Sequence, residues 1–246
     1  MTESVVIRAT NLAQSFGETV VFKGVNLEVY RGEIFVILGG SGSGKSTLMR
    51  QLIGLLPPTE GEIEVLGWAI PRERARVLSS IGVLFQSGAL FGSMTLLENV
   101  MLPLEMHTDL PPSARAQLAL VKLGLVGLGD AASLLPSEVS GGMAKRAAIA
   151  RALALDPPLL FLDEPSAGLD PITSAGLDRL ILNLRRDLGL TFVVVTHELA
   201  SILTIGDRCL MLDGASHRVI AEGNPKELKA HSENPVVRAF FDREVR

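Results

Sequence analysis

Residues 39–46 read Gly39-Gly40-Ser41-Gly42-Ser43-Gly44-Lys45-Ser46, which matches the nucleotide-binding pattern Gly-x-x-x-x-Gly-Lys-Ser/Thr. An apolar run over 33–38 precedes the stretch and predicts a buried strand, and a helical pattern over 45–55 follows it. In this context the glycines let successive backbone N–H groups turn toward phosphate oxygens, while the start of the helix adds partial positive charge. The stretch therefore predicts a nucleoside triphosphate site, which many kinds of enzyme share.

Three side chains at the end of this stretch have predicted roles in that site. Lys45 would reach the β- and γ-phosphates, and the Ser46 hydroxyl would ligate Mg²⁺. Thr47 is placed to contact the α-phosphate.

Short apolar runs alternate with helical patterns along the rest of the chain, which predicts an α/β fold. Short runs at 5–9, 20–22 and 25–29, with turns at Gly17 and Gly24, predict a small antiparallel sheet near the start. We expect one domain over 1–246, in which a helical lobe at about 88–158 is inserted into a phosphate-binding α/β core at about 1–87 and 159–246. The remaining predicted core strands are 81–85, 159–162, 191–195 and 209–212, and the predicted lobe helices are 96–104, 112–123 and 140–155.

Composition narrows the class of protein. The net charge of −4 and the pI near 5.6 argue against nucleic acid as the main partner. No window reaches the roughly 18 apolar residues that a membrane-spanning helix needs, and the first residues show no signal peptide, so we expect a cytoplasmic chain that meets a membrane only through partners. The single cysteine, Cys209, excludes an intrachain disulfide and a multi-cysteine metal site, and its apolar surroundings predict a buried strand position.

An acidic pair follows the apolar run at 159–162. Asp163 at the end of a core strand beside the phosphate loop could hold Mg²⁺ through water. The adjacent Glu164 could act as the general base that polarises the attacking water. An Asp-Glu pair is common at strand ends, and the phosphate loop in the same chain is what favours the catalytic interpretation.

Ser140-Gly141-Gly142-Met143 opens the third predicted lobe helix. Serine suits the N-cap, but each glycine in a first turn costs about 1 kcal/mol relative to alanine. Bare N–H groups at a helix start could meet a phosphate. From this stretch alone, a flexible cap and a second phosphate contact both remain open.

Taken in order, these motifs resemble those of the ATP-binding cassette (ABC) ATPases. Gln86, after the strand at 81–85, resembles the glutamine of the family's Q-loop, and Ser166-Ala167-Gly168-Leu169-Asp170 resembles its D-loop. His197, after the strand at 191–195, resembles the switch histidine, and Phe16 stands where the family stacks an aromatic ring on adenine. The resemblance covers nearly the whole chain.

The resemblance implies that two copies face each other head to tail. ATP would bind between the glycine-rich loop of one copy and Ser140–Gly142 of the other. His197 would hold the γ-phosphate and position the attacking water, and Gln86 would sense Mg²⁺ and that water. Asp170 would couple the two sites across the dimer.

One departure from the family pattern points to a subfamily. The family usually has Leu-Ser-Gly-Gly-Gln where this chain has Val139-Ser140-Gly141-Gly142-Met143, and methionine cannot replace the hydrogen bonds of the amide. With Gln-Ser-Gly-Ala-Leu-Phe at 86–91 and Glu-Asn-Val at 98–100, the chain resembles the ATPases of MCE-type lipid transporters, above all the maintenance-of-lipid-asymmetry (Mla) phospholipid system of Gram-negative bacteria.

This resemblance implies partners and a location. Such ATPases sit on the cytoplasmic face of the inner membrane with two permease subunits, a periplasmic MCE protein and often a STAS-domain subunit. The apolar stretch 87–106 would take up the permease's coupling helix or form ordinary lobe core. The end of the chain, 233–246, would dock on a neighbour or cover its own core.

Three alternatives remain. An ABC ATPase for another substrate, such as an amino acid or lipoprotein, is opposed by Met143 and the 86–91 run. A non-transport ABC ATPase of DNA repair or translation usually carries long insertions or two cassettes, whereas this chain has one. A binding module without activity is opposed by Lys45, Asp163, Glu164 and His197.

Overall fold

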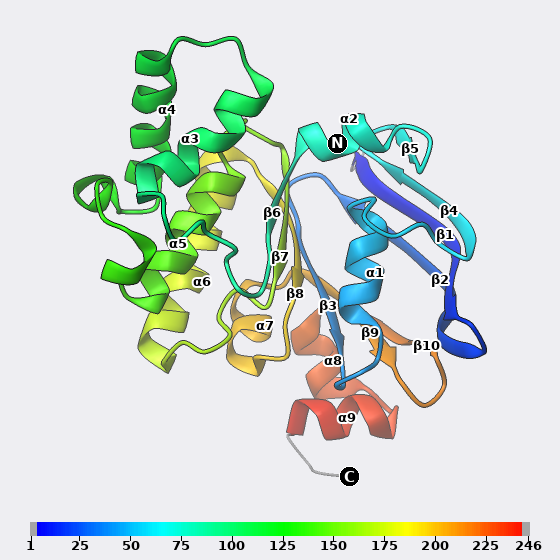
Figure 1. The fold of residues 1–246 in the computed structure, drawn as a ribbon. Coiled ribbons are helices and arrows are strands. Elements are labelled where there is room, and N and C mark those ends of the chain that lie inside the picture. Colours follow the sequence, from blue (N-terminus) through cyan, green and yellow to red (C-terminus); the bar gives the residue numbers. More distant parts are fainter. Residues whose placement is uncertain (1–3, 243–246) are drawn as a thin grey trace. The chain divides into compact units, whose positions relative to one another are not determined.

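A computed structural model describes residues 4–242 of the chain, which divides into two compact units (Figure 1). One unit comprises 1–78 and 191–246, and the other comprises 79–190. The lobe predicted over 88–158 falls within the second unit. This unit also holds a strand at 81–84 before the lobe, and a strand at 159–163 and a helix at 171–188 after it. The boundaries proposed for that lobe stay a prediction. Within the described residues, no helix has the length and apolar character that crossing a bilayer requires.

The predicted N-terminal antiparallel sheet is confirmed and is larger than expected. The runs at 20–22 and 25–29 belong to one strand, because Gly24, with a φ of 64°, lies in a bulge where the pairing shifts register rather than in a turn. The sheet also gains two strands that follow α1. Its order is β2-β1-β4-β5, with β1 (Val5–Phe16), β2 (Thr19–Tyr30), β4 (Glu60–Val65) and β5 (Trp68–Ile70).

Parallel strands form the centre of the first unit's core sheet. Every residue of β3 is buried, which is typical of a parallel strand covered on both faces. Ile37 of β3 lies beside Val195 of β8 and Leu210 of β9, so the carboxyl ends of the three strands share one edge. Along this part of the sheet the order is β10-β9-β3-β8, with β3 (Ile34–Gly39), β8 (Thr191–Val195), β9 (Arg208–Asp213) and an antiparallel β10 (Arg218–Gly223).

Cys209 is buried in β9, as predicted. Burial raises the pKa of its thiol to about 12, so the side chain is a neutral part of the core.

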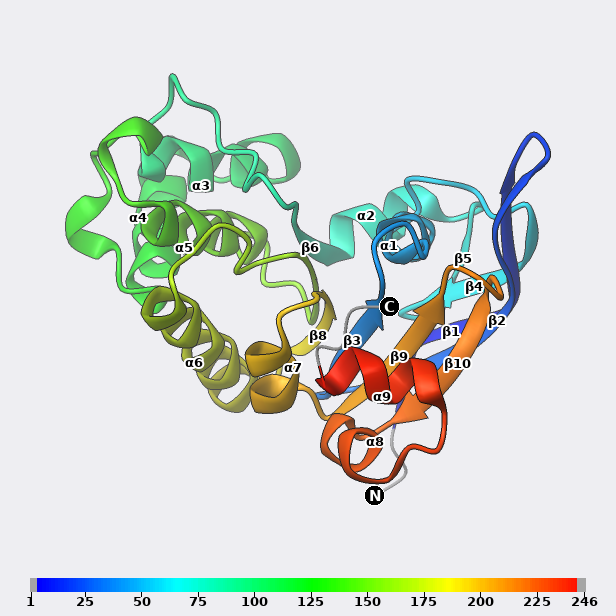
Figure 2. The ribbon, with the colours of Figure 1, turned by 90° about the horizontal axis from the view of Figure 1, so that it is seen from below.

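The first unit ends with two helices, α8 and α9, near β9 and β10 (Figure 2). α8 packs against β10 and α7, and α9 packs against α8. Val237 and Phe241 of α9 are buried, so this part of the 233–246 segment covers its own unit; residues 243–246 lie outside the described range. The helices are α1 (Lys45–Leu52), α2 (Arg74–Ser80, which runs past the end of the unit at 78), α7 (Leu199–Ile205), α8 (Pro225–His231) and α9 (Pro235–Asp242).

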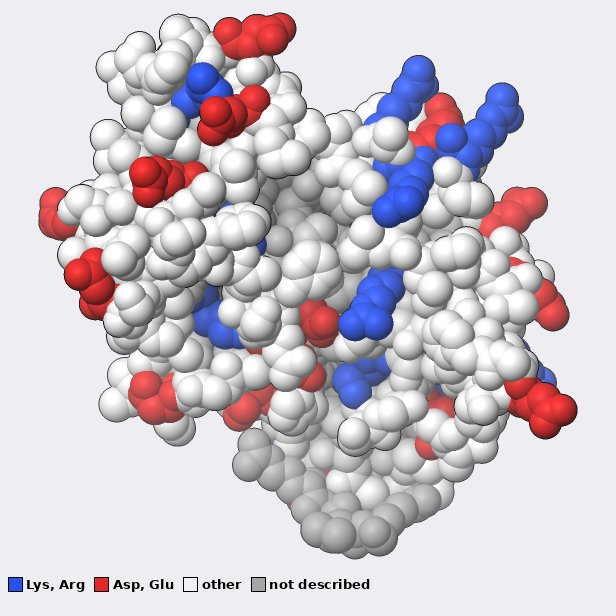
Figure 3. Space-filling view, viewed as in Figure 1, with Lys and Arg blue, Asp and Glu red and all other residues white. Residues whose placement is uncertain are grey.

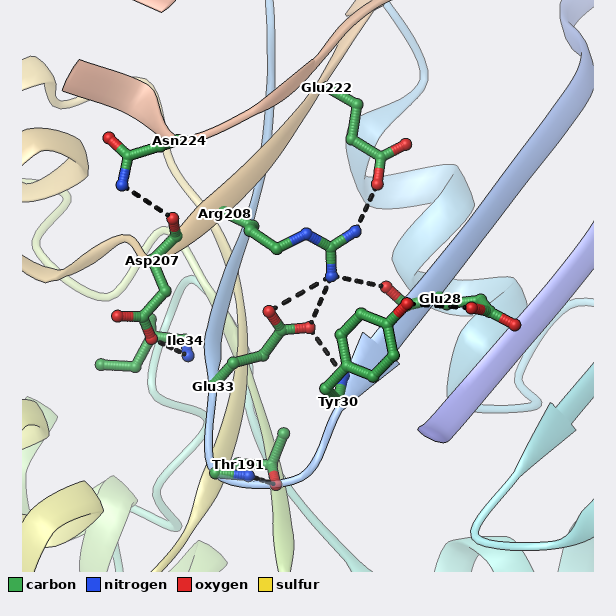
Figure 4. A network of polar contacts seen from close by, with 10 residues as sticks. Glu28, Tyr30, Glu33, Ile34, Thr191, Asp207, Arg208, Glu222 and Asn224 are labelled. Carbon is green, nitrogen blue, oxygen red and sulfur yellow. Dashed lines mark hydrogen bonds and ion pairs between the residues drawn. The ribbon is translucent and has the colours of Figure 1, made fainter. Parts of the chain in front are cut away.

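An ion-pair cluster joins the antiparallel sheet to the core sheet within the first unit (Figure 4). Arg208 of β9 donates to both carboxylate oxygens of Glu33, at 3.0 and 3.3 Å, and to the backbone oxygen of Glu28 at 3.2 Å. It also pairs with Glu222 of β10, and its guanidinium lies 5.0 Å from the ring centroid of Tyr30. Burial raises the pKa of Glu33, while the Tyr30 N–H and the charge of Arg208 act in the opposite direction. The cluster therefore fixes the end of β2 to β9 and β10.

The second unit combines two parallel strands with a helical bundle. Leu84 of β6 pairs with Leu162 of β7, so both strands end at the same edge. α5 packs against β6, α3, α4 and α6. The elements are β6 (Ile81–Leu84), α3 (Leu96–His107), α4 (Pro112–Leu125), two short 3₁₀ turns (Gly129–Ala131 and Pro136–Glu138), α5 (Gly141–Ala152), β7 (Leu159–Asp163) and α6 (Pro171–Leu188).

Candidate functional site

The glycine-rich loop in the first unit begins where β3 ends and leads into α1 (Figure 1). Gly39 has a φ of 145°, and a Cβ there would lie 2.3 Å from the backbone oxygen of Leu212. Gly44 has a φ of 95°, and its Cβ would lie 2.8 Å from the Val21 side chain. These two positions therefore require glycine for both conformation and space.

The donor groups of this loop suit an anionic ligand. Lys45 Nζ lies over the loop and donates to the backbone oxygens of Gly39 and Gly40, at 2.9 and 2.8 Å. Lys45, Ser46 and Thr47 line a pocket of about 320 Å³. Figure 3 shows further Lys and Arg side chains gathered over α1 and α2. An ammonium, two hydroxyls and the N–H groups at the start of α1 together form a donor set that fits a triphosphate.

Ser43 strengthens this fit. The residue is 1% exposed, and its Oγ atom has no hydrogen-bond partner among the described residues. A buried hydroxyl of this kind favours a ligand that can accept from it.

His197 lies in the first unit with the loop. It follows β8 by one intervening residue, Thr196, and its side chain is exposed. Because Val195 lies beside Ile37 of β3, His197 and the loop leave the sheet at the same edge. Phe16, the last residue of β1, is 54% exposed, which suits a ring available to stack on a base.

Ser140 caps α5 in the second unit, and its Oγ accepts a hydrogen bond from the Met143 N–H at 3.2 Å. The two following glycines differ. A Cβ at Gly142 would lie 2.3 Å from Thr173 Cγ2 of α6, so packing requires glycine there. A Cβ at Gly141 would make an ordinary 3.6 Å contact with Leu169, so packing does not explain this glycine, and the phosphate contact through its N–H group stays a prediction.

The acidic pair and the glutamine also lie in the second unit. Asp163 ends β7, and Glu164 has a φ of 48°, an uncommon conformation for a residue with a side chain. Gln86 is exposed and follows Leu84, the last residue of β6, by two positions, and Glu164 is half-buried and follows Leu162 of β7 by two positions. Since Leu84 and Leu162 are paired, Gln86 and Glu164 leave the sheet at the same edge.

Asp170 is the N-cap of α6. Its carboxylate accepts from the N–H groups of Ile172 and Thr173, both at 3.0 Å, and from the Thr173 hydroxyl. The hydroxyl of Thr173, followed by these N–H groups, lowers the pKa of Asp170. Its local role is thus a structural cap, and the predicted coupling across a dimer stays a prediction.

The structure thus groups the predicted residues by unit. Phe16, the loop from Gly39 to Thr47 and His197 belong to the first unit, and Gln86, Ser140–Gly142, Asp163, Glu164 and Asp170 belong to the second. Among the described residues, no group of three or more His, Cys, Asp or Glu side chains is placed to hold a metal ion. A magnesium ion bound by phosphates needs only one or two protein oxygens, such as the Ser46 hydroxyl and the Asp163 carboxylate.

Sequence analysis missed two cations of α5. Lys145 is 8% exposed, and its Nζ donates to the backbone oxygens of Gln86 and Glu164. Arg151 donates to the backbone oxygens of Gly88 and Ala89 at 2.9 and 2.7 Å. No sequence signal marks these two side chains, because both donate to main-chain oxygens that lie far away in the sequence.

Comparisons with known proteins identify the family of the chain. The profile of the family described as "ABC transporter" matches residues 22–167. The intermembrane phospholipid transport system ATP-binding protein MlaF of Escherichia coli K12 is 45% identical over 92% of the chain and 84% of its own length. MlaF of Haemophilus influenzae is 44% identical over 91% of the chain and 85% of its own length. The probable ribonucleotide transport ATP-binding protein mkl of Mycobacterium tuberculosis H37Rv is 42% identical over 97% of the chain and 67% of its own length.

Two solved structures are also similar to the chain. cbiO1 from Clostridium perfringens, part of the ABC transporter complex cbiONQ, has a TM-score of 0.85 and 29% identity, covering 99% of this chain and 100% of that one. The ATP-binding cassette MJ0796, in a dimeric post-hydrolysis state bound to ADP and Pi, has a TM-score of 0.78 and 33% identity, covering 89% of this chain and 98% of that one.

Proposed function

Because the chain belongs to the ABC transporter family, we propose that it is the ATP-hydrolysing subunit of a transporter that moves phospholipid between the inner and outer membranes. Its membership of this family identifies the chain as an ABC ATPase. The phospholipid cargo is supported chiefly by its similarity, over 91% and 92% of the chain, to two proteins named for intermembrane phospholipid transport. The run Val139–Met143, which departs from the common family pattern, supports the same subfamily.

The first unit would bind the nucleotide. The N–H groups from Gly39 to Gly44 would surround the phosphates, and Lys45 would exchange its contacts with the loop carbonyls for contacts with the β- and γ-phosphates. Thr47 would contact the α-phosphate, and the exposed ring of Phe16 would stack on adenine.

Glu164 would act as general base in hydrolysis. It would accept a proton from a water molecule as the water oxygen attacks the γ-phosphorus and the bond to the β-phosphate oxygen breaks. His197 would hold the γ-phosphate, and Gln86 would orient the water. Ser46, Gln86 and Asp163, the last through water, are the proposed oxygen ligands of Mg²⁺, which neutralises phosphate charge when bound.

Two copies of the chain would complete each site. Ser140, Gly141 and Gly142 of one copy would contact the γ-phosphate held by the loop of the other through the start of α5. Asp170 would couple the two sites. The dimeric state of the related cassette MJ0796 supports pairing of this kind.

The remaining partners would place the chain at the cytoplasmic face of the inner membrane. These partners would be two permease subunits and a periplasmic MCE protein, often with a STAS-domain subunit, as the resemblance to the phospholipid transport system implies. In the stretch 87–106, Leu96, Val100 and Leu104 are buried lobe core, whereas Phe91 and Met106 are 51% and 67% exposed. These exposed apolar side chains support a permease contact there.

A second candidate is an ABC ATPase that serves a different substrate. The mkl protein, named for probable ribonucleotide transport, is 42% identical over 97% of the chain, close to the values for the phospholipid relatives. Transporters for amino acids or lipoproteins belong to this alternative as well.

The catalytic assignment is tested by Glu164→Gln in the purified full chain. We expect ATP turnover to fall by about 1,000-fold or more while ATP binding remains, because the variant keeps the shape of the side chain and loses the base. Turnover at the wild-type rate would overturn the assignment.

The cargo is tested by affinity purification of the tagged chain from its native membranes. We expect permease and MCE subunits in the complex, and ATP-dependent phospholipid transfer by that complex in liposomes. A stable complex with a different permease and no MCE protein would establish the alternative.

A further inference from the structure

Lys145 of α5 is a buried cation with two main-chain acceptors. Only 8% of the residue is exposed, and its Nζ donates to the backbone oxygen of Gln86 at 2.5 Å and to that of Glu164 at 3.4 Å. Burial lowers the pKa of Lys145, and the carboxylates of Glu164 and Asp163 oppose this effect. A buried ammonium is costly unless it is hydrogen-bonded, so these acceptors account for its position.

The two acceptors lie at corresponding positions of neighbouring strands. Gln86 follows Leu84 of β6 by two residues, Glu164 follows Leu162 of β7 by two residues, and Leu84 and Leu162 are paired. One ammonium group therefore bridges the segments that leave these two strands. Both segments carry a residue that the proposed function assigns to hydrolysis.

The rest of the 86–89 loop lies along the same face of α5. Lys145, Ala148 and Arg151 follow one another at spacings of three, which places them along one side of the helix. A Cβ at Gly88 would lie 3.7 Å from Ala148, and Arg151 donates to the backbone oxygens of Gly88 and Ala89. The loop is thus attached to α5 at both ends, and a movement of the helix would carry the loop with it.

We propose that Lys145 is a positioning residue that links the start of α5 to Gln86 and Glu164. Ser140 caps this helix, and Lys145 follows it within two turns. A phosphate that engages Ser140–Gly142 would shift or fix α5, and Lys145 passes that state to the backbone of both hydrolytic residues. Hydrolysis then depends on engagement of the second copy, whereas the binding of ATP to the first unit does not depend on that engagement. This inference rests on the proposed roles of Glu164, Gln86 and Ser140–Gly142.

The test compares Lys145→Met with Lys122→Met in the purified full chain. Lys122 is a matched control, since it lies in the same unit, is 6% exposed and pairs with Asp156 instead of the loop. Turnover is expressed per bound nucleotide, counted by titration with a fluorescent ATP analogue, so that unfolded protein does not contribute. Thermal unfolding is recorded for both variants.

We expect Lys145→Met to lower kcat by about 10- to 100-fold, because a shift of about 1 Å in a reacting group has effects of this size. The Kd for ATP should stay within about threefold of the wild-type value, since the loop from Gly39 to Thr47 belongs to the other unit. Lys145→Arg should restore most of the turnover, because a guanidinium can donate to both carbonyls. Lys122→Met should lower the unfolding temperature and leave kcat per bound nucleotide unchanged.

Two results would overturn the proposal. One is a wild-type kcat in Lys145→Met, and the other is an equal loss of kcat in Lys122→Met. The Glu164→Gln variant separates this failure from that of the proposed function. If Glu164→Gln stops turnover while Lys145→Met keeps the wild-type kcat, only the positioning role of Lys145 is wrong. Turnover that persists in Glu164→Gln means that the catalytic assignment itself is wrong.

Discussion

The loop at 39–46 and the stretch Ser140–Gly142 are both glycine-rich starts of a helix, yet they are built in different ways. Gly39 and Gly44 have positive φ angles, and the cap of α1, Gly44, makes no side-chain hydrogen bond. α5 begins with an ordinary serine cap, and neither of its glycines has a positive φ. The start of α1 therefore needs backbone conformations that glycine permits, whereas α5 starts as a regular helix that does not need glycine for its conformation.

The two helix starts are thus rich in glycine for different physical reasons. In the loop, conformation and packing both demand glycine, so structure and phosphate binding cannot be separated at Gly39. In α5 the two demands fall on different residues: packing requires glycine at 142, whereas the proposed phosphate contact would account for Gly141. Substitutions can therefore separate stability from function at α5 and not at Gly39.

The largest effect is expected for Gly39→Ala. The added methyl group would lie 2.3 Å from the Leu212 carbonyl oxygen in a strained backbone conformation. We expect the free energy of unfolding to fall by about 4 kcal/mol, as measured by urea denaturation. Gly40→Ala is the control, because a Cβ there meets nothing within 4 Å. The free energy of unfolding of this control should stay within about 1 kcal/mol of the wild-type value. An equal loss in both variants would contradict the steric argument.

Gly142→Ala should destabilise the chain by about 2 kcal/mol, because its methyl group would overlap Thr173 Cγ2. Thr173→Ser removes that carbon and keeps the hydroxyl that bonds Asp170. The double variant should recover most of the lost stability in the same denaturation measurement. If it recovers none, packing against α6 is not the reason for this glycine.

Ser140→Ala should reduce the free energy of unfolding by about 1 kcal/mol, the usual value of a lost serine cap. Ser140→Asp restores an acceptor for the Met143 N–H and should recover this stability. Its negative charge would repel a phosphate, so ATP turnover should stay low. Recovery of both stability and turnover would argue against a phosphate contact at this position.

No loss of stability is expected for Gly141→Ala. Its methyl group has room beside Leu169 and alanine favours the helix, so the free energy of unfolding should rise by up to about 1 kcal/mol. ATP turnover should nevertheless fall, because the methyl group would keep a phosphate away from the helix start. Wild-type turnover in this variant would contradict the proposed phosphate contact at Gly141.

Much of the fold could be predicted from the sequence, because buried strands such as β3 and β8 are short, apolar and bounded by polar or turn residues. The extra strands β4 and β5 were missed because the predicted strands were apolar runs, whereas β4 alternates charged and apolar residues over only its last four positions and β5 has only three residues. Gly24 was mistaken for a turn because a bulge glycine and a turn glycine look alike in sequence.

The candidate site shows a similar limit. Side chains within recognisable motifs, such as Lys45 and Glu164, could be assigned roles before the structure was known. Lys145 could not, because its acceptors are main-chain oxygens 59 and 19 residues away in the sequence, and a carbonyl group carries no residue identity. The same reasoning applies to Gly142, whose need for glycine depends on Thr173 of another helix.

The strand order of the first unit has a consequence for the synthesis of the chain. β3 lies between β8 and β9, which leave the ribosome only after the whole of 79–190 has been made. At about 5–20 residues per second, the N-terminal segment waits roughly 6–22 s for these neighbours, while the second unit, contiguous in sequence, can already begin to fold. The buried apolar face of β3 is thus exposed in the nascent chain during that interval. We therefore expect ribosome-associated chaperones to bind this segment.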